Sequence, residues 1–277
     1  MTRILLTRFA ALACLLGGAP AALAQADEMV FGIYPYLSPS QIVEQFTPLK
    51  DYLAKSLGQP LNMVSAPDFK SFIERTRQGE YDLIFTAPHM GRLAEKRDGY
   101  RRVAQTGYQI VILVLARKDG KIRSLDDLRG RTIAIGSKMS MTYQVVDHAL
   151  RKRKMALEKE VKVLETPSFS NVPPAVMRGE AAAGGTATLL WDVAPPDQRQ
   201  ALQEIFRAEP TPGLLVLAHP RVGDAGIRRL QAALTAFKDT PEGAAYFKRT
   251  QQVDFRPIDD ATMKRIDPFT AVLTQPD

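Results

Sequence analysis

Cysteine is almost missing from this 277-residue chain, and so are long apolar runs. The one cysteine, Cys14, cannot form an internal disulfide and lies in the N-terminal stretch. The apolar run from Phe9 is broken by Gly17, Gly18 and Pro20 before it reaches the roughly 20 residues that a bilayer-spanning helix needs. Beyond this stretch the sequence excludes thiol catalysis, thiolate metal sites and a membrane span.

Histidine is also sparse. The three histidines, His89, His148 and His219, stand 59 and 71 residues apart. This spacing gives no local metal-binding pair, and the sequence has neither a Gly-x-Ser-x-Gly elbow nor a Gly-rich nucleotide-phosphate loop. His148 falls within a predicted helix, which favours a surface or core histidine over a catalytic base. We therefore expect no enzymatic activity, no metal and no cofactor, with an exported hydrolase as the remote alternative.

The N-terminal residues have the pattern of a cleavable signal peptide. Arg3 and Arg8 precede the apolar stretch Phe9 to Leu16, and the small-residue triplet Ala22-Leu23-Ala24 follows. The pattern predicts a signal peptide over residues 1–24, with cleavage after Ala24. We therefore expect an exported, periplasmic protein.

The net charge is modest and gives little information about partners. The whole chain carries +7, and removal of Arg3 and Arg8 with the signal peptide leaves +5. That balance fits either an anionic ligand or simple solubility. The one dense basic run, Arg151 to Lys154, has no aromatic residue beside it and is expected at the C-terminal end of a helix. We therefore expect no nucleic-acid partner.

Strand-like and helix-like segments alternate along the chain from Met29, which is typical of an α/β protein. Ordinary globular composition, with 45% hydrophobic and 24% charged residues, and a length of about two typical domains allow two lobes. In the first part of the chain we expect strands and helices in alternation: strands at 29–34, 61–65 and 81–86, and helices at 40–57 and 69–77.

The segment Val103 to Ala116 is too long and apolar for one lobe's strand, so we interpret it as a strand that crosses to a second lobe. That lobe should contain strands at 132–135, 161–164 and 181–186 and helices at 124–130, 140–154 and 171–178. A strand at 214–218 returns the chain, and helices at 223–238, 241–248 and 259–273 follow.

These elements predict two lobes joined by a two-segment hinge, with a cleft between them. Residues 27–113 plus 214–277 form the first lobe, and residues 114–213 form the second. Ligand sites in open α/β sheets lie beyond the carboxyl ends of the strands, where helix N-termini offer free N–H groups to anions. The loops after the strands are therefore where a site is expected.

Hydrogen-bonding side chains gather in these loops. Hydroxyls, amides and helix-end N–H groups hold an oxyanion without a cationic side chain, although helix capping is an equal explanation for each serine or threonine. Packing likewise remains an alternative role for Tyr34 and Tyr36. The candidate ligand-binding residues are Tyr34, Tyr36, Ser38, Thr86, His89, Ser137, Ser140, Thr142, Tyr143, Ser170, Asn171 and Thr186.

Several segments, in their order and spacing, make the chain resemble the phosphate/phosphonate-type periplasmic substrate-binding proteins of ABC transporters. The resemblance implies the type II periplasmic-binding fold, in which two α/β lobes close on a small ligand and deliver it to a membrane permease. The segments are Phe31-Gly32-Ile33, Phe46 to Leu49, Ala66 to Phe69, Tyr81 to Phe85, Ser124 to Leu128 with Ile133 to Gly136, Val176 to Glu180, and Pro210 to Gly213.

Two departures from the family pattern bear on the ligand. Phosphonate-binding members have Ser-Thr-Ser-Gly at the start of a second-lobe helix, whereas Ser140-Met141-Thr142-Tyr143 keeps two hydroxyls. Some members have an adjacent His-Glu where Phe169-Ser170 stands here, so a partner for an ammonium group is not evident. The resemblance therefore implies a small anionic ligand, with phosphate, phosphite, a phosphonate or a small organic acid as alternatives.

The partner also has two alternatives at this point. Family membership implies an ABC permease, and a membrane sensor kinase is the alternative, because some binding proteins present their ligand to one. We expect the chain to act as a monomer in either role.

Overall fold

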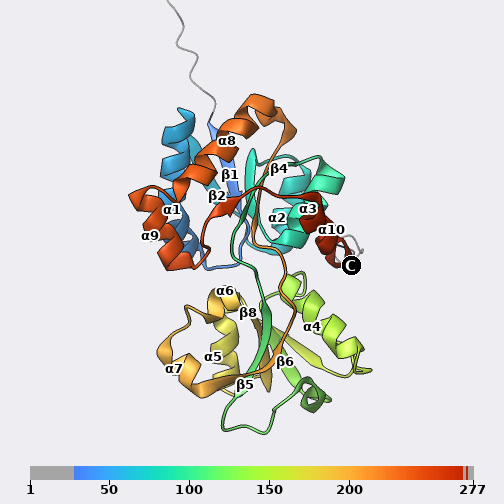
Figure 1. Ribbon diagram of the computed structural model, residues 1–277. Helices are drawn as coiled ribbons and strands as arrows, with labels where there is room; N and C mark the ends of the chain where they lie inside the picture. Colours follow the sequence, from blue (N-terminus) through green and yellow to red (C-terminus); the bar gives the residue numbers. More distant parts are fainter. Residues whose placement is uncertain (1–27, 271–272, 274–277) are drawn as a thin grey trace, which may run out of the picture.

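Two α/β lobes, each built on its own sheet, form the computed structural model, which describes residues 28–270 and residue 273 (Figure 1). One sheet has six strands in the order β11-β4-β10-β3-β1-β2, and the other has five in the order β7-β6-β8-β5-β9. The expected two-lobe α/β architecture is confirmed. The predicted signal peptide lies outside the described residues, and none of the helices within them combines the length and apolar character that a bilayer span requires.

The first sheet is parallel on one side, over β3, β1 and β2, and antiparallel on the other, over β10, β4 and β11. Strand β1 (Met29–Ile33) pairs in parallel with β2 (Leu61–Ser65) and β3 (Leu83–Thr86). Strand β10 (Leu215–Ala218) returns from the second lobe and pairs antiparallel with β3 and with β4 (Arg101–Thr106). The carboxyl ends of β1 and β3 point toward the second lobe, and the loops that follow them face it (Figure 1).

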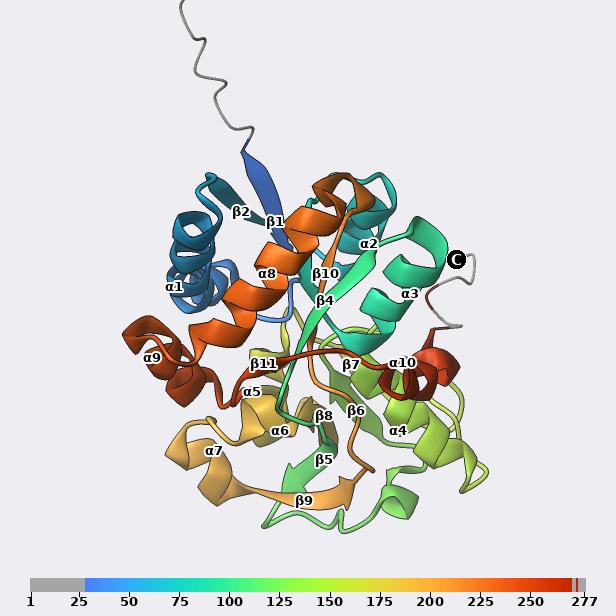
Figure 2. The same ribbon diagram turned by 45° about the horizontal axis from the view of Figure 1, so that its top comes forward.

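Helices cover both faces of this sheet (Figure 2). Helix α1 begins at the capping box that Ser38 and Gln41 form and is terminated by Gly58, whose positive φ of 64° favours glycine. Its apolar face contacts α8 and α9, while α2 contacts α3, which contacts α10. The bounds are α1 (Pro39–Leu57), α2 (Phe69–Arg77), α3 (Pro88–Asp98), α8 (Gly223–Phe237), α9 (Pro241–Thr250) and α10 (Asp260–Ile266), and the edge strand is β11 (Phe255–Arg256).

Small residues at the centre of the second sheet let helices approach it closely. A Cβ on Gly184 would lie 2.6 Å from Val172 of α5, and one on Gly185 would lie 2.8 Å from Thr142 of α4. Since successive residues of a strand face opposite sides, α4 and α5 cover opposite faces. The elements are β5 (Ile112–Arg117), β6 (Thr132–Ile135), β7 (Lys162–Glu165), β8 (Ala183–Ala187), β9 (Leu202–Arg207), α4 (Met141–Arg151), α5 (Val172–Met177), α6 (Thr188–Trp191) and α7 (Pro196–Ala201).

The hinge differs from the single crossing strand that the sequence predicts over Val103 to Ala116. The structure divides this segment into β4 and β5, because β4 pairs in the first sheet and β5 pairs with β8 and β9 in the second. Residues 107–111 connect them, and residues 208–214 make the return crossing. The two crossings are joined by reciprocal backbone hydrogen bonds between Ile110 and Thr211, with N···O distances of 3.0 and 2.8 Å.

Several short elements are absent from the sequence-based expectation. Helix α3 begins at Pro88, where the sequence suggested only the end of a strand, and proline suits the first turn of a helix. Helices α6 and α7 have four and six residues, too few to show a helical period. Strands β9 and β11 are also absent from the sequence-based expectation, and both lie at sheet edges.

Gly213 is essential to the hinge because the second crossing passes directly against the first. A Cβ at this position would lie 2.3 Å from the Thr106 carbonyl oxygen and 2.6 Å from that of Tyr108. Gly213→Ala should therefore lower the free energy of unfolding by about 1–3 kcal/mol or more, since backbone atoms must move. Urea unfolding followed by fluorescence measures this change.

Gly120→Ala is the matched control, because its nearest neighbour, the Arg117 carbonyl oxygen, would lie at an ordinary 3.4 Å. This substitution should change the free energy of unfolding by less than about 0.5 kcal/mol. Equal stabilities for the two variants would contradict the proposed crowding at the hinge.

Candidate functional site

Two adjoining cavities lie between the lobes. The inner cavity has a volume of about 50 Å³ and is lined by residues of the hinge, of the loop after β1 and of the N-termini of α3 and α4. The outer chamber has a volume of about 380 Å³ and lies between α1 and the end of α9 on one lobe and α5 and α6 on the other. Both are lined by Tyr36, Phe169, Leu189 and Leu190, so the two spaces adjoin at these residues.

The inner cavity lies where two eleven-residue helices begin. Helix α4 has Ser140 as its N-cap: the Ser140 hydroxyl accepts from the Tyr143 N–H at 3.1 Å and donates to the Ser137 carbonyl at 2.6 Å. Helix α3 has Ala87 as its N-cap, so no side chain caps its first N–H groups. Uncapped N–H groups and the positive end of the helix dipole favour an anion.

None of the described residues that line the inner cavity is Lys, Arg, Asp or Glu. Its polar lining consists of the hydroxyls of Tyr34, Tyr36, Ser140 and Thr142 and the ring of His89. Neutral hydroxyls and helix-end amides are sufficient donors for an oxyanion in a buried site, where each hydrogen bond is electrostatically stronger than in water. The cavity is therefore suited to a small anion held by neutral donors.

His89 connects the two lobes. Its side chain is fully buried, and its Nε2 lies 2.9 Å from the Met139 carbonyl oxygen of the second lobe. Burial lowers the pKa of His89 to about 4, against the opposing effect of this backbone hydrogen bond, so the ring is neutral near pH 7. Because a carbonyl only accepts, Nε2 carries the proton, and Nδ1 is an acceptor that has no partner.

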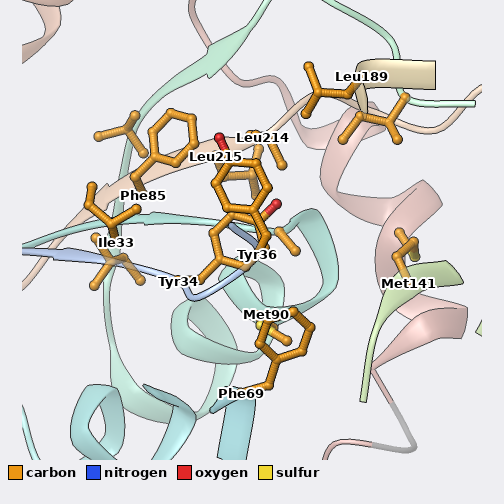
Figure 3. Close-up of a cluster of buried hydrophobic side chains, with 14 of the residues drawn as sticks. Ile33, Tyr34, Tyr36, Phe69, Phe85, Met90, Met141, Leu189, Leu214 and Leu215 are labelled. Carbon is orange, nitrogen blue, oxygen red and sulfur yellow. The ribbon is translucent and has the colours of Figure 1, made fainter. Parts of the chain in front are cut away.

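Tyr34 and Tyr36 stack on each other, with ring centroids 4.5 Å apart and an interplanar angle of 8°. Figure 3 shows the pair between Ile33 and Phe85 of the first lobe and Leu189 of the second. Burial raises the pKa of both tyrosines well above the usual value, so both hydroxyls remain protonated donors. The Tyr36 hydroxyl also accepts from Gln45 Nε2 at 2.8 Å, which fixes its position.

Apolar walls that the sequence analysis missed complete the inner cavity. Phe69 of α2 and Phe169 of the second lobe approach across the cleft, with ring centroids 6.3 Å apart. A Cβ on Gly136 would lie 2.8 Å from the Phe169 ring, so this glycine makes room for the wall. Phe169 stands directly before the predicted Ser170, which was the one sequence signal for it.

The structure brings together seven of the twelve predicted site residues. Thr86 lies close by but outside both linings, fully buried and with an unpartnered hydroxyl. The inner cavity contains Tyr34, Tyr36, His89, Ser140 and Thr142, and the outer chamber adds Ser170 and Thr186.

The other four predicted residues line neither cavity, and each has a local contact or position. Ser38 is the N-cap of α1, and Ser137 accepts from the Met139 N–H at 3.2 Å in the turn before α4. The amide oxygen of Asn171 accepts from the Ser168 hydroxyl at 3.3 Å. Tyr143 is half-buried in the first turn of α4. Ser38 therefore caps a helix, which is the alternative role that the sequence left open for each serine.

The described residues contain no group of three or more His, Cys, Asp or Glu side chains arranged to hold a metal ion. His148, which the sequence placed within a helix, is exposed in the last turn of α4. The basic run that begins at Arg151 lies at the end of the same helix, as predicted.

The depressed pKa of His89 gives a stability profile with a defined sign. In the unfolded chain the imidazole takes up a proton below about pH 6.5, whereas the folded protein resists protonation until about pH 4. The free energy of unfolding should therefore fall as the pH is lowered through this window, by about 3 kcal/mol from this group. Above about pH 6.5, His89 should make no contribution to the change of the free energy of unfolding with pH.

Urea unfolding of the wild type and of His89→Gln at several pH values tests this. The difference between the two proteins removes the contribution of all other titrating groups. A difference that stays constant between about pH 6.5 and 4 would contradict a neutral, buried His89.

Solved structures of binding proteins share this fold. A binding-protein component of an ABC phosphonate transporter from Pseudomonas aeruginosa matches with a TM-score of 0.80 and 20% identity, over 90% of this chain and 87% of that one. PhnD1 from Prochlorococcus marinus, in complex with methylphosphonate, matches with a TM-score of 0.80 and 15% identity, over 89% and 98%. XAC2383 from Xanthomonas citri, bound to chloride ion, matches with a TM-score of 0.75 and 22% identity, over 89% and 97%.

The family is shown by a match over most of the chain. A family model described as the phosphonate, periplasmic substrate-binding protein of ABC transporters matches residues 31–263. This match confirms the resemblance found in the sequence and supports a binding function over the sensor-partner and hydrolase alternatives. The chain therefore belongs to the phosphonate-type periplasmic substrate-binding proteins of ABC transporters.

Proposed function

We propose that the protein binds a phosphonate-type oxyanion in the inner cavity and delivers it to an ABC permease. The observation that carries this proposal is the convergence of two helix N-termini, α3 from one lobe and α4 from the other, on a cavity lined by neutral donors. A ligand held by both lobes binds the closed form more tightly than the open form and so shifts the equilibrium toward closure. The two-segment hinge provides the axis for that motion.

Tyr34, Tyr36 and Thr142 are the side-chain donors in this proposal, with the first N–H groups of α3 and α4. Ser140 and Ser137 contribute indirectly, because the Ser140 hydroxyl donates its proton to the Ser137 carbonyl at 2.6 Å and so holds the turn that leads into α4. Ser170 and Thr186 line the outer chamber, where they contact the part of the ligand beyond the oxyanion.

His89 supplies a reason for preferring a phosphonate over a sulfonate. A phosphonate monoanion carries a P–OH group that can donate, whereas a sulfonate has only acceptor oxygens. The unpartnered Nδ1 of His89 is an acceptor on a residue that lines the cavity. A P–OH donor would satisfy it, and a sulfonate oxygen beside it would be repelled.

The cellular setting follows from this function. The family places the protein in the periplasm, and we propose that the N-terminal 24 residues are the signal peptide that exports it. We further propose that the protein acts as a monomer, with lobe boundaries near residues 113 and 214. Binding without turnover is the expected chemistry, since the inner cavity offers donors for an anion and a histidine held neutral.

Removing a donor from the cavity should weaken binding of methylphosphonate. Thr142→Val deletes a donor and should reduce affinity by about 1–3 kcal/mol if that hydroxyl bonds the ligand in a desolvated site. Ser140→Ala removes the hydroxyl that holds the first turn of α4 and should reduce affinity by a smaller amount. Isothermal titration calorimetry with methylphosphonate measures the change.

Ser38→Ala is the matched control for Ser140→Ala. Both substitutions remove a helix N-cap and should cost similar stability, about 0.5–2 kcal/mol, but Ser38 lines neither cavity. The control should keep wild-type affinity. If Thr142→Val also binds like the wild type, its hydroxyl is not a ligand donor.

Near pH 7, methylphosphonate should bind more tightly than methanesulfonate, by about tenfold or more. A sulfonate would leave the buried Nδ1 of His89 without a donor and be repelled by it, which costs about 1 kcal/mol or more. Competition calorimetry with the two compounds gives the ratio. His89→Gln should reduce the ratio, since an amide can rotate to donate to a sulfonate oxygen. A ratio near one in the wild type would refute the role given to Nδ1.

A further inference from the structure

The outer chamber is larger than a methyl substituent needs. Its volume of about 380 Å³ compares with about 50 Å³ for the inner cavity that it adjoins. Tyr36, Phe169, Leu189 and Leu190 line both spaces, so a substituent on an oxyanion in the inner cavity would pass between these residues. The chamber thus has the size and the connection needed to hold the organic part of a longer ligand.

The chamber carries no net side-chain charge. Among the described residues of its lining, Glu44 and Arg249 are the only carboxylate and guanidinium, and these two exposed side chains contact each other. The Arg249 guanidinium lies 3.6 Å from the Glu44 carboxylate and donates to the Glu44 carbonyl at 3.2 Å. A substituent bearing an ammonium or a second anionic group would therefore find no unpaired counter-charge, which favours an uncharged group.

Two buried polar groups in the chamber wall lack partners. Gln252 is fully buried, and its Oε1 accepts from the Tyr246 hydroxyl at 3.1 Å, which fixes the amide orientation. Its Nε2 has no partner in good hydrogen-bond geometry, and the amide also interacts with the Tyr36 hydroxyl, where it opposes the effect of burial on the pKa of that hydroxyl. Thr250 is 6% exposed, and its hydroxyl is also unpartnered.

Unpartnered buried donors are unfavourable, so these two groups point to a ligand that supplies oxygen atoms. Further amides lie in the same lining at Gln41, Gln45 and Gln198. Amides both donate and accept, as hydroxyl groups do. Trp191 and Pro173 provide apolar surface in the same chamber, suited to the C–H groups of a short carbon chain.

We propose that the outer chamber binds an uncharged, hydroxyl-bearing organic group attached to the oxyanion. The ligand class is then a small polyol phosphonate or polyol phosphate ester, rather than a bare alkylphosphonate or an aminophosphonate. This inference rests on the proposed function, because it needs the oxyanion in the inner cavity. Gln252 and Thr250 are the specificity-determining residues, and the chemistry that they recognise is a hydroxyl oxygen.

A series of phosphonates with one common head group tests the inference by calorimetry. The compounds are methylphosphonate, propylphosphonate, 2,3-dihydroxypropylphosphonate and 3-aminopropylphosphonate. The dihydroxypropyl compound should bind about tenfold more tightly than the propyl compound, which is the effect of satisfying one or two buried groups. The aminopropyl compound should bind no better than the propyl compound.

The outcomes separate this inference from the proposed function. Equal affinity for the propyl and dihydroxypropyl compounds, with methylphosphonate still bound, overturns the assignment of the chamber and leaves the oxyanion site standing. Failure of all four compounds to bind overturns the proposed function itself. Preference for the aminopropyl compound overturns the conclusion that the substituent is uncharged. Glycerol phosphate and glycerol, added as further probes, distinguish a phosphate ester from a free polyol.

Two substitutions locate the effect in the chamber. Gln252→Met and Thr250→Val should each reduce the ratio of dihydroxypropyl to propyl affinity by about threefold to tenfold. Thr250→Val keeps the shape of the side chain and removes a hydroxyl without a partner, so it should fold even if Gln252→Met does not. Gln231→Met, on the exposed face of α8, is the control and should keep the wild-type ratio. An unchanged ratio in Thr250→Val and Gln252→Met refutes the proposed role of these residues.

Discussion

The proposed burial of an anion without a cationic side chain is the constraint on which the arrangement of the two lobes would depend. The inner cavity has no charged side chain among the described residues of its lining, so the favourable field must come from oriented dipoles. Helices α3 and α4 supply them only when the lobes meet, because one helix begins in each lobe. Burial reinforces this design by raising the pKa of Tyr34 and Tyr36, which keeps their hydroxyls protonated.

The hinge connects the two lobes whose helices meet at the inner cavity. The two crossings are joined by the Ile110–Thr211 hydrogen bonds, and Leu214 also accepts from the Thr106 N–H at 2.8 Å. They therefore behave as a paired ribbon rather than as two independent linkers. Strands β5 and β10 continue from it into opposite sheets, so a small change in the ribbon would rotate whole lobes while leaving each core intact.

Much of this fold could be predicted from the sequence, because apolar periodicity and turn residues define its main elements. Strands β2 and β6 and helix α2 have the predicted bounds. The site was only partly predictable. His89 and Ser140 follow strand ends, which gave the signal, whereas Phe69 and Gln252 take their roles from tertiary packing. Ser38 and Ser140 are both helix N-caps, and only the three-dimensional arrangement tells which one faces a cavity.

The neutrality of the inner cavity has a consequence for the conditions under which the protein works. Sites that hold anions with exposed arginines or lysines weaken as salt rises, because mobile ions screen the attraction. In the proposed site the attraction would come from helix ends and protonated hydroxyls enclosed between two lobes, where dissolved ions have little access. Such a receptor would keep its affinity when the salinity of the surrounding medium changes, an advantage in a compartment that shares its small ions with the outside.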